Sequence, residues 1–553
     1  MMKRAGNRLS SRSTGRGKRP LARQRKRRPQ NRHRFLPRPC NERMVSGFIA
    51  EHREGRASAR PRASRRLPLP AAVTPPPQKP LRLCVSALKN AQLLNPKSYL
   101  PTPRAAVLCL VLASAGLLYG APPAPTITFL TDRPSAVYAC GEETTVTLRI
   151  NDAQGGLLKT GTVSFTVDNF GTNRLAVQKL TLARDNPFVW RGTLHHPGFL
   201  RCRAALDGQK LVKPVVYGIA FDPCGIRLGS GGPPPDFDAY WRGEIARLDR
   251  EVPLDARVTR LASACTAATE VSRVSFATFN GKRVHGFLSV PADRSRGPFP
   301  VRVTVPWAGP GAHAPETRPD DDRVITLVIN IHDFEPGPDA ATQRRKYDEQ
   351  NRRYADDVAG IKLRSAYENH RYAGYTDRTT YFYHDPLLGI RRAVLWVLER
   401  PEADRTRVGY FGRSQGGGMG MMLTALTPVF SRALFCQPAM ADMLAGRVGR
   451  RAGWPMLMER ARPEDRAAVA VTAAYYDAGH FASRVQCECR VLIGFADEAC
   501  PPPSVYAAYN ELRGPKTILH DVGVPHSNPP SYLQNQAWIL ELPTQATPKK
   551  VTP

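Results

Sequence analysis

Alternating apolar and polar positions mark the first patterned part of the chain, which begins after Pro125. Period-two runs rich in Thr, Val and Phe occur at 126–130, 144–150, 162–168, 179–183 and 188–194. Gly, Asn and Asp turn signals separate these runs, and none of them has a long helical period. The pattern predicts a β-sandwich domain over 121–221. No cluster of His, Asp, Glu or Ser stands out in it, so we expect this domain to pack on its neighbour or touch substrate.

The pattern changes beyond 229–235 (GSGGPPP), which indicates a linker or turn rather than a phosphate-binding loop. Apolar positions at a spacing of three to four residues predict an amphipathic helix over 236–248. Apolar strands then alternate with helices; the strands are expected at 299–305, 324–331, 408–412, 433–437 and 490–495, and the helices at 387–398 and from Gln415 onward. This alternation predicts an α/β domain over 222–544, with a mainly parallel sheet and helices on both faces. A polar tail follows at 545–553.

Charge is distributed unevenly along the 553 residues. The chain has 80 Lys and Arg against 47 Asp and Glu, a net charge of +33, of which +24 lies in residues 1–104. This segment is rich in Arg, Pro and Ser and has no structural period, so we expect it to be disordered. A basic tail that binds nucleic acid is the alternative. Because the segment has no aromatic interleaving and no recognisable module, we expect no nucleic-acid partner.

An apolar run at 105–120 (AAVLCLVLASAGLLYG) follows the positive residues Lys89, Lys97 and Arg104. Sixteen residues fall short of the roughly 20 that span a bilayer, and small residues follow the run, which is typical of a secretory signal. We therefore expect a secreted or periplasmic protein without a stable membrane anchor; an uncleaved anchor is the alternative. Because signals act at a nascent N-terminus, we also expect the initiator near 85–99, with 1–104 as upstream sequence translated by mistake.

Eight of the 11 cysteines lie beyond the apolar run, enough for up to four disulfides in an exported protein. We expect Cys140 and Cys202, which share the β-sandwich domain, to pair. Cys487, Cys489 and Cys500 lack a second paired cluster and nearby histidines, so they predict buried thiols or a disulfide rather than a zinc site. We expect no metal and no cofactor.

The segment from Gly412 to Gly416 reads G-x-S-x-G, with Ser414 at its centre. An apolar strand precedes it directly and an apolar helical segment follows, which is the context of a nucleophile elbow. Glycines on both sides allow the backbone to turn sharply and to pack closely. The pattern therefore predicts that the Ser414 hydroxyl is a nucleophile above the sheet.

A serine nucleophile needs a general base, and the base needs an orienting acid; in this fold they follow the serine in the order acid, then histidine. Asp497 comes just after a predicted strand, at the carboxyl end where α/β sites form, and His526 lies in a later loop. These two residues fit the order. Four rivals are less well placed: Glu498, Asp521, His520 and His480.

Two backbone N–H groups should stabilise the negative charge that develops on the substrate oxygen. The first belongs to Gln415, which follows the nucleophile. We expect the second from Ala308, in the loop 306–309 after the first central strand. The neighbouring Trp307 would bring a large indole to the rim and narrow the substrate pocket; the alternative is that it packs under the loop.

Several segments together resemble the acetyl xylan esterase and cephalosporin C deacetylase branch of the α/β-hydrolases. They are GRSQGGG around Ser414, YYDAGHFASRVQC at 475–487, GFADEACPPPSVYAAYN at 494–510, GPKTIL at 514–519 and PPDFDAYW at 234–241. The resemblance covers about 300 residues. It implies the α/β-hydrolase fold, the triad Ser414, Asp497 and His526, and hydrolysis of acetyl esters, commonly on sugars. The chain departs from the family in its oxyanion loop, where Pro306, Trp307 and Ala308 replace the frequent His-Gly-Tyr, and in its added β-rich domain.

The sequence thus predicts an exported serine esterase that removes acetyl groups from a carbohydrate through a Ser-His-Asp triad, with an acetylated sugar or oligosaccharide as its partner. A general carboxylesterase or a serine peptidase of the same fold is the first alternative. A nonenzymatic carbohydrate-binding protein that uses the β-sandwich is the second.

Overall fold

The structure is a computed structural model that describes residues 124–208, 212–316, 318, 320–361, 363 and 366–541. The basic segment 1–104, the predicted signal 105–120 and the polar tail 545–553 lie outside the described residues. Within the described part, no helix has both the length and the apolar character needed to cross a membrane.

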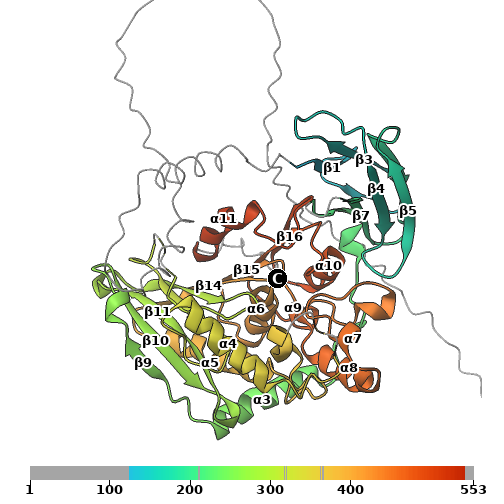
Figure 1. The fold of residues 1–553 in the computed structure, drawn as a ribbon. Helices are drawn as coiled ribbons and strands as arrows, with labels where there is room; N and C mark the ends of the chain where they lie inside the picture. The colour runs from blue at the N-terminus through green and yellow to red at the C-terminus, as the bar shows by residue number, and fades with distance from the viewer. Residues whose placement is uncertain are drawn as a thin grey trace, which may run out of the picture. The chain divides into compact units, whose positions relative to one another are not determined.

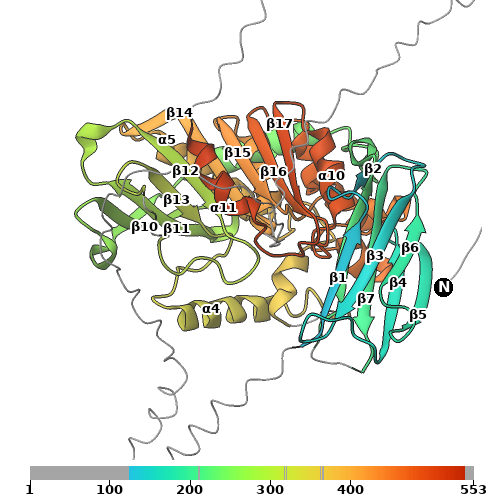
Figure 2. The same ribbon diagram turned by 90° about the horizontal axis from the view of Figure 1, so that it is seen from above.

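The first part of the described chain consists of eight strands in two sheets (Figures 1 and 2). One sheet has the order β1-β3-β6 and the other the order β2-β8-β7-β4-β5. Their bounds are β1 Thr126–Thr131, β2 Val137–Tyr138, β3 Thr144–Asn151, β4 Thr162–Asp168, β5 Arg174–Thr181, β6 Phe188–Gly192, β7 Gly198–Leu206 and β8 Val215–Phe221. We call this unit the β-sandwich.

The two sheets of the β-sandwich share one apolar core. Successive side chains of a strand point to opposite faces of the sheet, and in β3 every second residue is buried. One face of this strand therefore contributes to the core. Leu148 of β3, Phe165 of β4 and Cys202 of β7 belong to the same buried cluster. Apolar side chains of both sheets therefore meet face to face and hold the unit together.

A nine-stranded sheet forms the centre of the second part, in the order β17-β16-β15-β14-β12-β13-β11-β10-β9. The strands β12 to β17 run parallel, and β9, β10 and β11 extend one edge antiparallel. Their bounds are β9 Arg257–Arg260, β10 Thr269–Ala277, β11 Arg283–Pro291, β12 Phe299–Val305, β13 Ile325–Ile329, β14 Ala403–Arg413, β15 Arg432–Cys436, β16 Glu488–Gly494 and β17 Lys516–Asp521.

Helices cover both faces of this sheet (Figure 2). Neighbouring residues of β14 point to opposite faces of the sheet and meet different helical segments. Tyr410 packs against Gly420 of the helix that follows the strand. Phe411 packs on the other face with Trp538 and Ile539, near the C-terminus. The helices are α3 Phe237–Glu251, α4 Ala340–Arg353, α5 His384–Leu398, α6 Gln415–Leu426, α7 Leu457–Arg460, α8 Arg466–Tyr475, α9 Ala478–Ala482, α10 Pro502–Glu511 and α11 Ser531–Gln536. This arrangement confirms the predicted fold class, an α/β-hydrolase sheet preceded by a small β-sandwich.

The β-sandwich packs on the loop after β16 and on α10 (Figure 1). Phe199 of β7 makes an edge-to-face contact with Phe495, with ring centroids 5.0 Å apart, and a second contact with Tyr506 of α10. Gly218 of β8 lies so close to the Phe495 carbonyl that a Cβ there would be 2.0 Å from the oxygen. The two parts therefore meet through an aromatic contact and a backbone approach that only glycine permits.

The predicted disulfide between Cys140 and Cys202 is wrong, because both residues are free thiols. Cys202 is fully buried in the sandwich core, whereas the Cys140 thiol lies beside the carboxylate of Asp222. Cys487, Cys489 and Cys500 are also free and buried, which agrees with the expected buried thiols.

Candidate active site

Ser414 lies at the sharp turn between β14 and α6. Its φ of 54° places a non-glycine residue in the left-handed region, a strained conformation held by hydrogen bonds on both sides of the residue. The Ser414 N–H donates to the Cys436 carbonyl at 2.9 Å, and the Ser414 carbonyl accepts from the Ala439 N–H at 2.9 Å. Gly416 lies against the Val305 carbonyl, where a Cβ would be 2.1 Å from the oxygen. The turn is therefore fixed by its neighbouring strands and by close packing on β12.

The structure brings Ser414, His526 and Asp497 together. His526 Nε2 lies 3.0 Å from Ser414 Oγ, and His526 Nδ1 lies 2.8 Å from Asp497 Oδ2. Asp497 is fully buried, and its other oxygen accepts from the N–H groups of Ala499 and Cys500, each at 2.8 Å. Because the carboxylate can only accept, His526 carries its proton on Nδ1 and offers the Nε2 lone pair to the serine hydroxyl.

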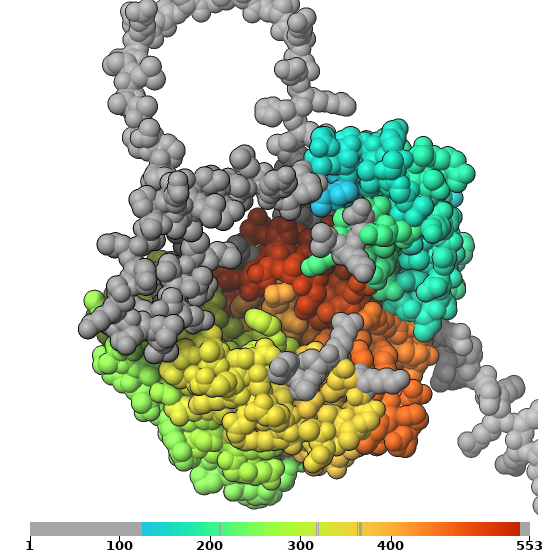
Figure 3. Space-filling model, viewed as in Figure 1, coloured from blue at the N-terminus to red at the C-terminus, as the bar shows by residue number. Residues whose placement is uncertain are grey.

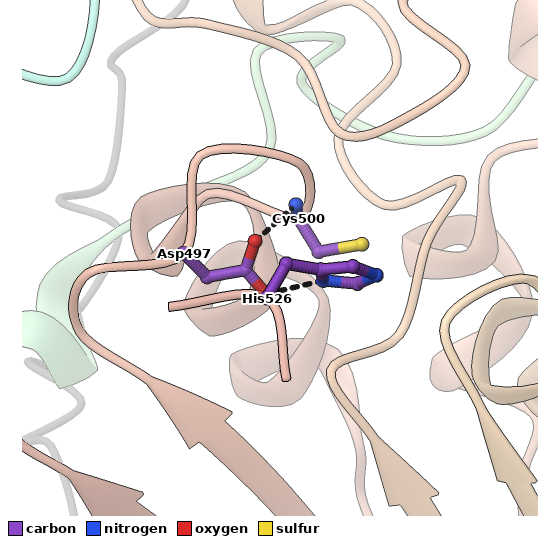
Figure 4. Close-up of side chains that lie close together, drawn as sticks. All are labelled: Asp497, Cys500 and His526. Carbon is purple, nitrogen blue, oxygen red and sulfur yellow. Dashed lines mark hydrogen bonds and ion pairs between the residues drawn. The ribbon is translucent and has the colours of Figure 1, made fainter. Parts of the chain in front are cut away.

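Cys500 lies beside this group (Figure 4). One ligand atom each of Asp497, Cys500 and His526 lie within 4.8 Å of one another, a spacing that a metal ion could bridge. Burial raises the pKa of the Cys500 thiol well above its ordinary value, so the thiol is protonated in this structure. Asp497 Oδ2 and His526 Nδ1 already bond to each other, and Asp497 Oδ1 accepts from two backbone N–H groups. The donor set therefore fits a hydrogen-bonded group better than a metal site.

The four rival residues have other partners. Glu498 pairs with Arg201 at 2.8 Å, and Asp521 accepts from Ser531 Oγ at 2.8 Å. His480 lies 2.7 Å from Ser230 Oγ, and His520 is buried within β17 against Phe495. Among the described residues, none of these four forms a hydrogen bond with Ser414, so the geometry favours His526 and Asp497.

The loop after β12 carries Ala308 and lies against the turn at Ser414, since the Gln415 side chain donates to the Pro306 carbonyl at 3.5 Å. Two buried side chains hold this loop. His332 Nε2 lies 2.8 Å from the Gly309 carbonyl, and the Asn330 amide makes two hydrogen bonds with the backbone of Ala312. Burial lowers the pKa of His332 to about 4, so this imidazole is neutral and donates to Gly309 through Nε2–H.

The backbone N–H groups of Gln415 and Ala308 are both available in the described chain. Gln415 is the first residue of α6, where the N–H groups have no partner within the helix. The side chain of Gln415 is fixed separately, because its oxygen accepts from the Tyr383 hydroxyl at 2.9 Å. No described residue accepts a hydrogen bond from Ala308 N–H.

Trp307 lies apart from the cavity beside His526. Its side chain is 60% exposed, and it lines a cavity of about 250 Å³ together with Phe411, Arg413 and Tyr532. The cavity beside His526, of about 610 Å³, shares no lining residue with it.

Several residues that line the cavity beside His526 were not found by sequence reasoning. Arg203 of β7 lines it from the β-sandwich, and the others come from the 3₁₀ segment Ala366–Tyr372, from the region around α7, and from the loops after β16 and β17. They include Arg371, Arg451, Trp454 and Arg460. A lone arginine on a strand carries no motif, so no signal in the sequence could have pointed to Arg203.

A sheet of this order, with a serine at the turn after β14 and a histidine beside it, defines the class of hydrolases with the α/β-hydrolase fold. The chain belongs to the acetyl xylan esterase family, since the pattern described as "Acetyl xylan esterase (AXE1)" matches residues 229–314 and 344–541, and it is therefore a carboxylic ester hydrolase. This confirms the resemblance seen in the sequence, and membership makes the protein an esterase of carbohydrate esters.

Individual proteins are similar to parts of this chain. "Acetyl esterase Axe7A" of Xylanibacter ruminicola is 27% identical over 346 residues, which are 62% of this chain and 73% of that protein. Among solved structures, an acetyl xylan esterase from Paenibacillus sp. R4 is 23% identical with a TM-score of 0.46, covering 57% of this chain and 98% of that one. Acetyl xylan esterase 1 from Thermoanaerobacterium sp. JW/SL YS485 is 19% identical with a TM-score of 0.46, covering 58% and 98%.

Proposed function

We propose that this protein removes acetyl groups from acetylated sugars or oligosaccharides through a covalent acyl-enzyme. Ser414 is the nucleophile, His526 the general base and Asp497 the orienting acid. The observation that carries the proposal is the chain of hydrogen bonds from Ser414 Oγ through His526 to the buried Asp497. Family membership and the acetyl esterase relatives support acetyl as the acyl group.

In the first half of the reaction, His526 Nε2 takes the proton of the Ser414 hydroxyl while Oγ attacks the acetyl carbon. The carbonyl oxygen gains negative charge, which the N–H groups of Gln415 and Ala308 stabilise. The resulting imidazolium is stabilised by Asp497. It then gives its proton to the sugar oxygen, so that the sugar alcohol leaves and the acetyl group stays on Ser414.

In the second half, a water molecule replaces the sugar. His526 takes a proton from the water, the hydroxide adds to the acetyl carbon, and Ser414 leaves with the proton held by His526. The products are acetate and the free enzyme. No cofactor takes part in either half of this scheme.

The walls of the cavity beside His526 suit a sugar. Trp454 and Tyr372 line it together with charged side chains, and pockets for small molecules commonly combine aromatic rings with a few polar groups. The Arg371 guanidinium lies over one face of the Trp454 ring, 4.6 Å from its centroid, and a sugar ring would pack on the remaining surface of the indole while its hydroxyls meet the polar groups. This supports a carbohydrate alcohol as the leaving group.

We propose in addition that the protein is exported, with the apolar run 105–120 as its secretory signal and cleavage near 120–124. The positive flank and the small residues after the run support this. Mass spectrometry of the protein from its native source tests it: the expected N-terminal peptide begins near residue 121, and a mature protein that retains the segment 23–28 would contradict export by this signal.

The acetyl-esterase proposal is tested with the purified protein on an acetylated xylose oligomer, 4-nitrophenyl acetate, 4-nitrophenyl octanoate and a peptide 4-nitroanilide. We expect acetate release from the first two and little turnover of the others. Ser414→Ala should abolish the release, while the exposed Ser164→Ala in β4 serves as the matched control. Preference for the octanoate would favour a general carboxylesterase, and cleavage of the anilide a peptidase.

A further inference from the structure

The cavity beside His526 has an excess of positive charge. Its lining includes four arginines and two glutamates: Arg203, Arg371, Arg451, Arg460, Glu368 and Glu498. Pockets for neutral sugars need no such excess, because hydroxyl groups are recognised by neutral and negative partners as well as by positive ones.

Both glutamates of this lining already have arginine partners. Glu368 pairs with Arg371 at 2.9 Å, with both side chains largely buried. Glu498 pairs with Arg201, which lies on the same strand as Arg203 but outside the cavity lining. Both glutamates are thus held by arginines, and four arginines against two glutamates leave the described lining with a positive surplus.

Arg203 owes its position to the alternation of β7. Cys202 and Ala204 point into the sandwich core, so Phe199, Arg201 and Arg203 lie on the opposite face of the strand. Phe199 packs on Phe495, and Arg201 binds Glu498. Figure 3 shows the blue-green β-sandwich packed against the orange and red segments near the C-terminal end of the chain, which include Phe495 and Glu498. The next residue of this face, Arg203, is thereby brought to the wall of the cavity.

The Arg203 guanidinium has no ion-pair partner among the described carboxylates, although its neighbour on the same face, Arg201, has two. The Arg203 side chain is exposed, while its backbone is fixed in the sheet by pairing with Val216 and Thr166. An arginine that is held at a cavity wall with its five N–H donors unused is suited to bind a carboxylate in a bidentate manner.

We propose that this cavity is a subsite for a carboxylate of the substrate, and that Arg203 of the β-sandwich is its specificity-determining residue. The preferred substrate is then an acetyl ester of a sugar acid, or of an oligosaccharide that carries one near the acetylated position. The inference rests on the proposed function and names the substrate class of that same site. It also gives the β-sandwich, which precedes the segments matched by the family, a direct part in substrate selection.

The test compares two esters that differ only in the group at C6, a carboxylate in methyl 2-O-acetyl-glucuronoside and a hydroxymethyl group in methyl 2-O-acetyl-glucoside. We expect the kcat/KM of the wild type to be at least about 10-fold higher for the acid, as one charge-assisted bidentate contact would give. Arg203→Gln should lower this ratio by about 10-fold, chiefly through KM, and Arg203→Lys should retain part of it. Raising the salt concentration should lower the ratio in the wild type.

Arg174→Gln is the matched control, because Arg174 is an exposed arginine of β5 outside the cavity lining. It should keep the wild-type ratio. If the wild type has nearly the same kcat/KM for both esters, the carboxylate subsite is wrong but the esterase function stands. If it releases acetate from neither ester, the proposed function itself is wrong. A ratio that Arg203→Gln leaves unchanged, or that Arg174→Gln lowers equally, also overturns the assignment to Arg203.

Discussion

Arg201 of the β-sandwich donates a hydrogen bond of 2.8 Å to Glu498, the residue that directly follows Asp497. The same guanidinium binds Asp168 of β4 at 2.7 Å, and its side chain is only 15% exposed. One arginine therefore connects the β-sandwich to the loop that carries the proposed orienting acid. Such a contact ties the conformation of that loop to the packing of the two parts.

The first prediction concerns this connection. Arg201→Met leaves Asp168 partly buried without its partner, so we expect the free energy of unfolding to fall by about 2 kcal/mol. Urea unfolding measures the change. Lys179→Met is the control, because Lys179 is 72% exposed and lies 3.9 Å from Asp207, a pair expected to contribute less than about 1 kcal/mol.

A double-mutant cycle with Glu498→Gln separates the two partners of Arg201. We expect a coupling energy of about 1 kcal/mol between Arg201 and Glu498, and a lower kcat in both single variants because the Asp497 loop loses its support. If the cycle gives no coupling and kcat is unchanged, the contact is only a surface pair.

The second prediction concerns the way Ser414, His526 and Asp497 act together. Ser414→Ala and His526→Ala should each lower kcat for 4-nitrophenyl acetate by about 10⁴-fold or more, and Asp497→Asn somewhat less. The double variant of Ser414 and His526 should lose no more than either single one, because the groups act as a unit. Circular dichroism checks that each variant folds. Losses that multiply would contradict a common mechanism.

The position of the site could be predicted where its signals are local in the chain. Ser414 lies at a turn because Gly412 and Gly416 flank it and an apolar strand leads into it, all within a few residues.

The strands of the antiparallel edge were not predicted. In β11, six consecutive residues are buried, so the period-two signal is absent where both faces of the strand are covered.

The sequence could not predict which distant segments of the chain pack together. Arg203 meets the cavity only because β7 packs on the loop after β16, a contact between segments far apart in the chain. Trp307 is next to Ala308 in sequence, but adjacency does not fix the direction of a side chain. Hydrogen bonds from His332 and Asn330 set the conformation of that loop, and neither residue carries a motif.

The third prediction concerns His332 as a positioning residue. His332→Phe keeps a ring against Phe334 but removes the donor to the Gly309 carbonyl, so the loop with Ala308 loses one of its supports. We expect kcat to fall by about 10- to 100-fold with KM nearly unchanged, since an oxyanion donor acts in the transition state. His332→Gln, which retains an N–H donor, should recover part of the loss. An unchanged kcat in His332→Phe would show that the hydrogen bond to Gly309 does not position Ala308 for catalysis.

The fourth prediction concerns stability in acid. Burial lowers the pKa of His520 to about 4, so between pH 6.5 and 4 the unfolded chain binds a proton at this residue that the folded chain does not bind. The free energy of unfolding should therefore fall as the pH is lowered through this window, by up to about 1.4 kcal/mol per pH unit for this histidine. Above pH 6.5 the contribution to stability is fully present.

His520→Phe should remove this dependence. No described residue bonds either ring nitrogen of His520, and its ring stacks on Phe495 at 4.7 Å, so phenylalanine loses no hydrogen bond and keeps the contact. We expect the variant to unfold at higher urea than the wild type at pH 5, with a smaller gain at pH 7.5 from removal of the unpaired polar atoms. His196→Phe, at an exposed histidine of the β-sandwich, is the control. If wild type and His520→Phe lose stability in parallel between pH 6.5 and 4.5, His520 binds its proton equally in the folded and the unfolded chain, and burial does not lower its pKa.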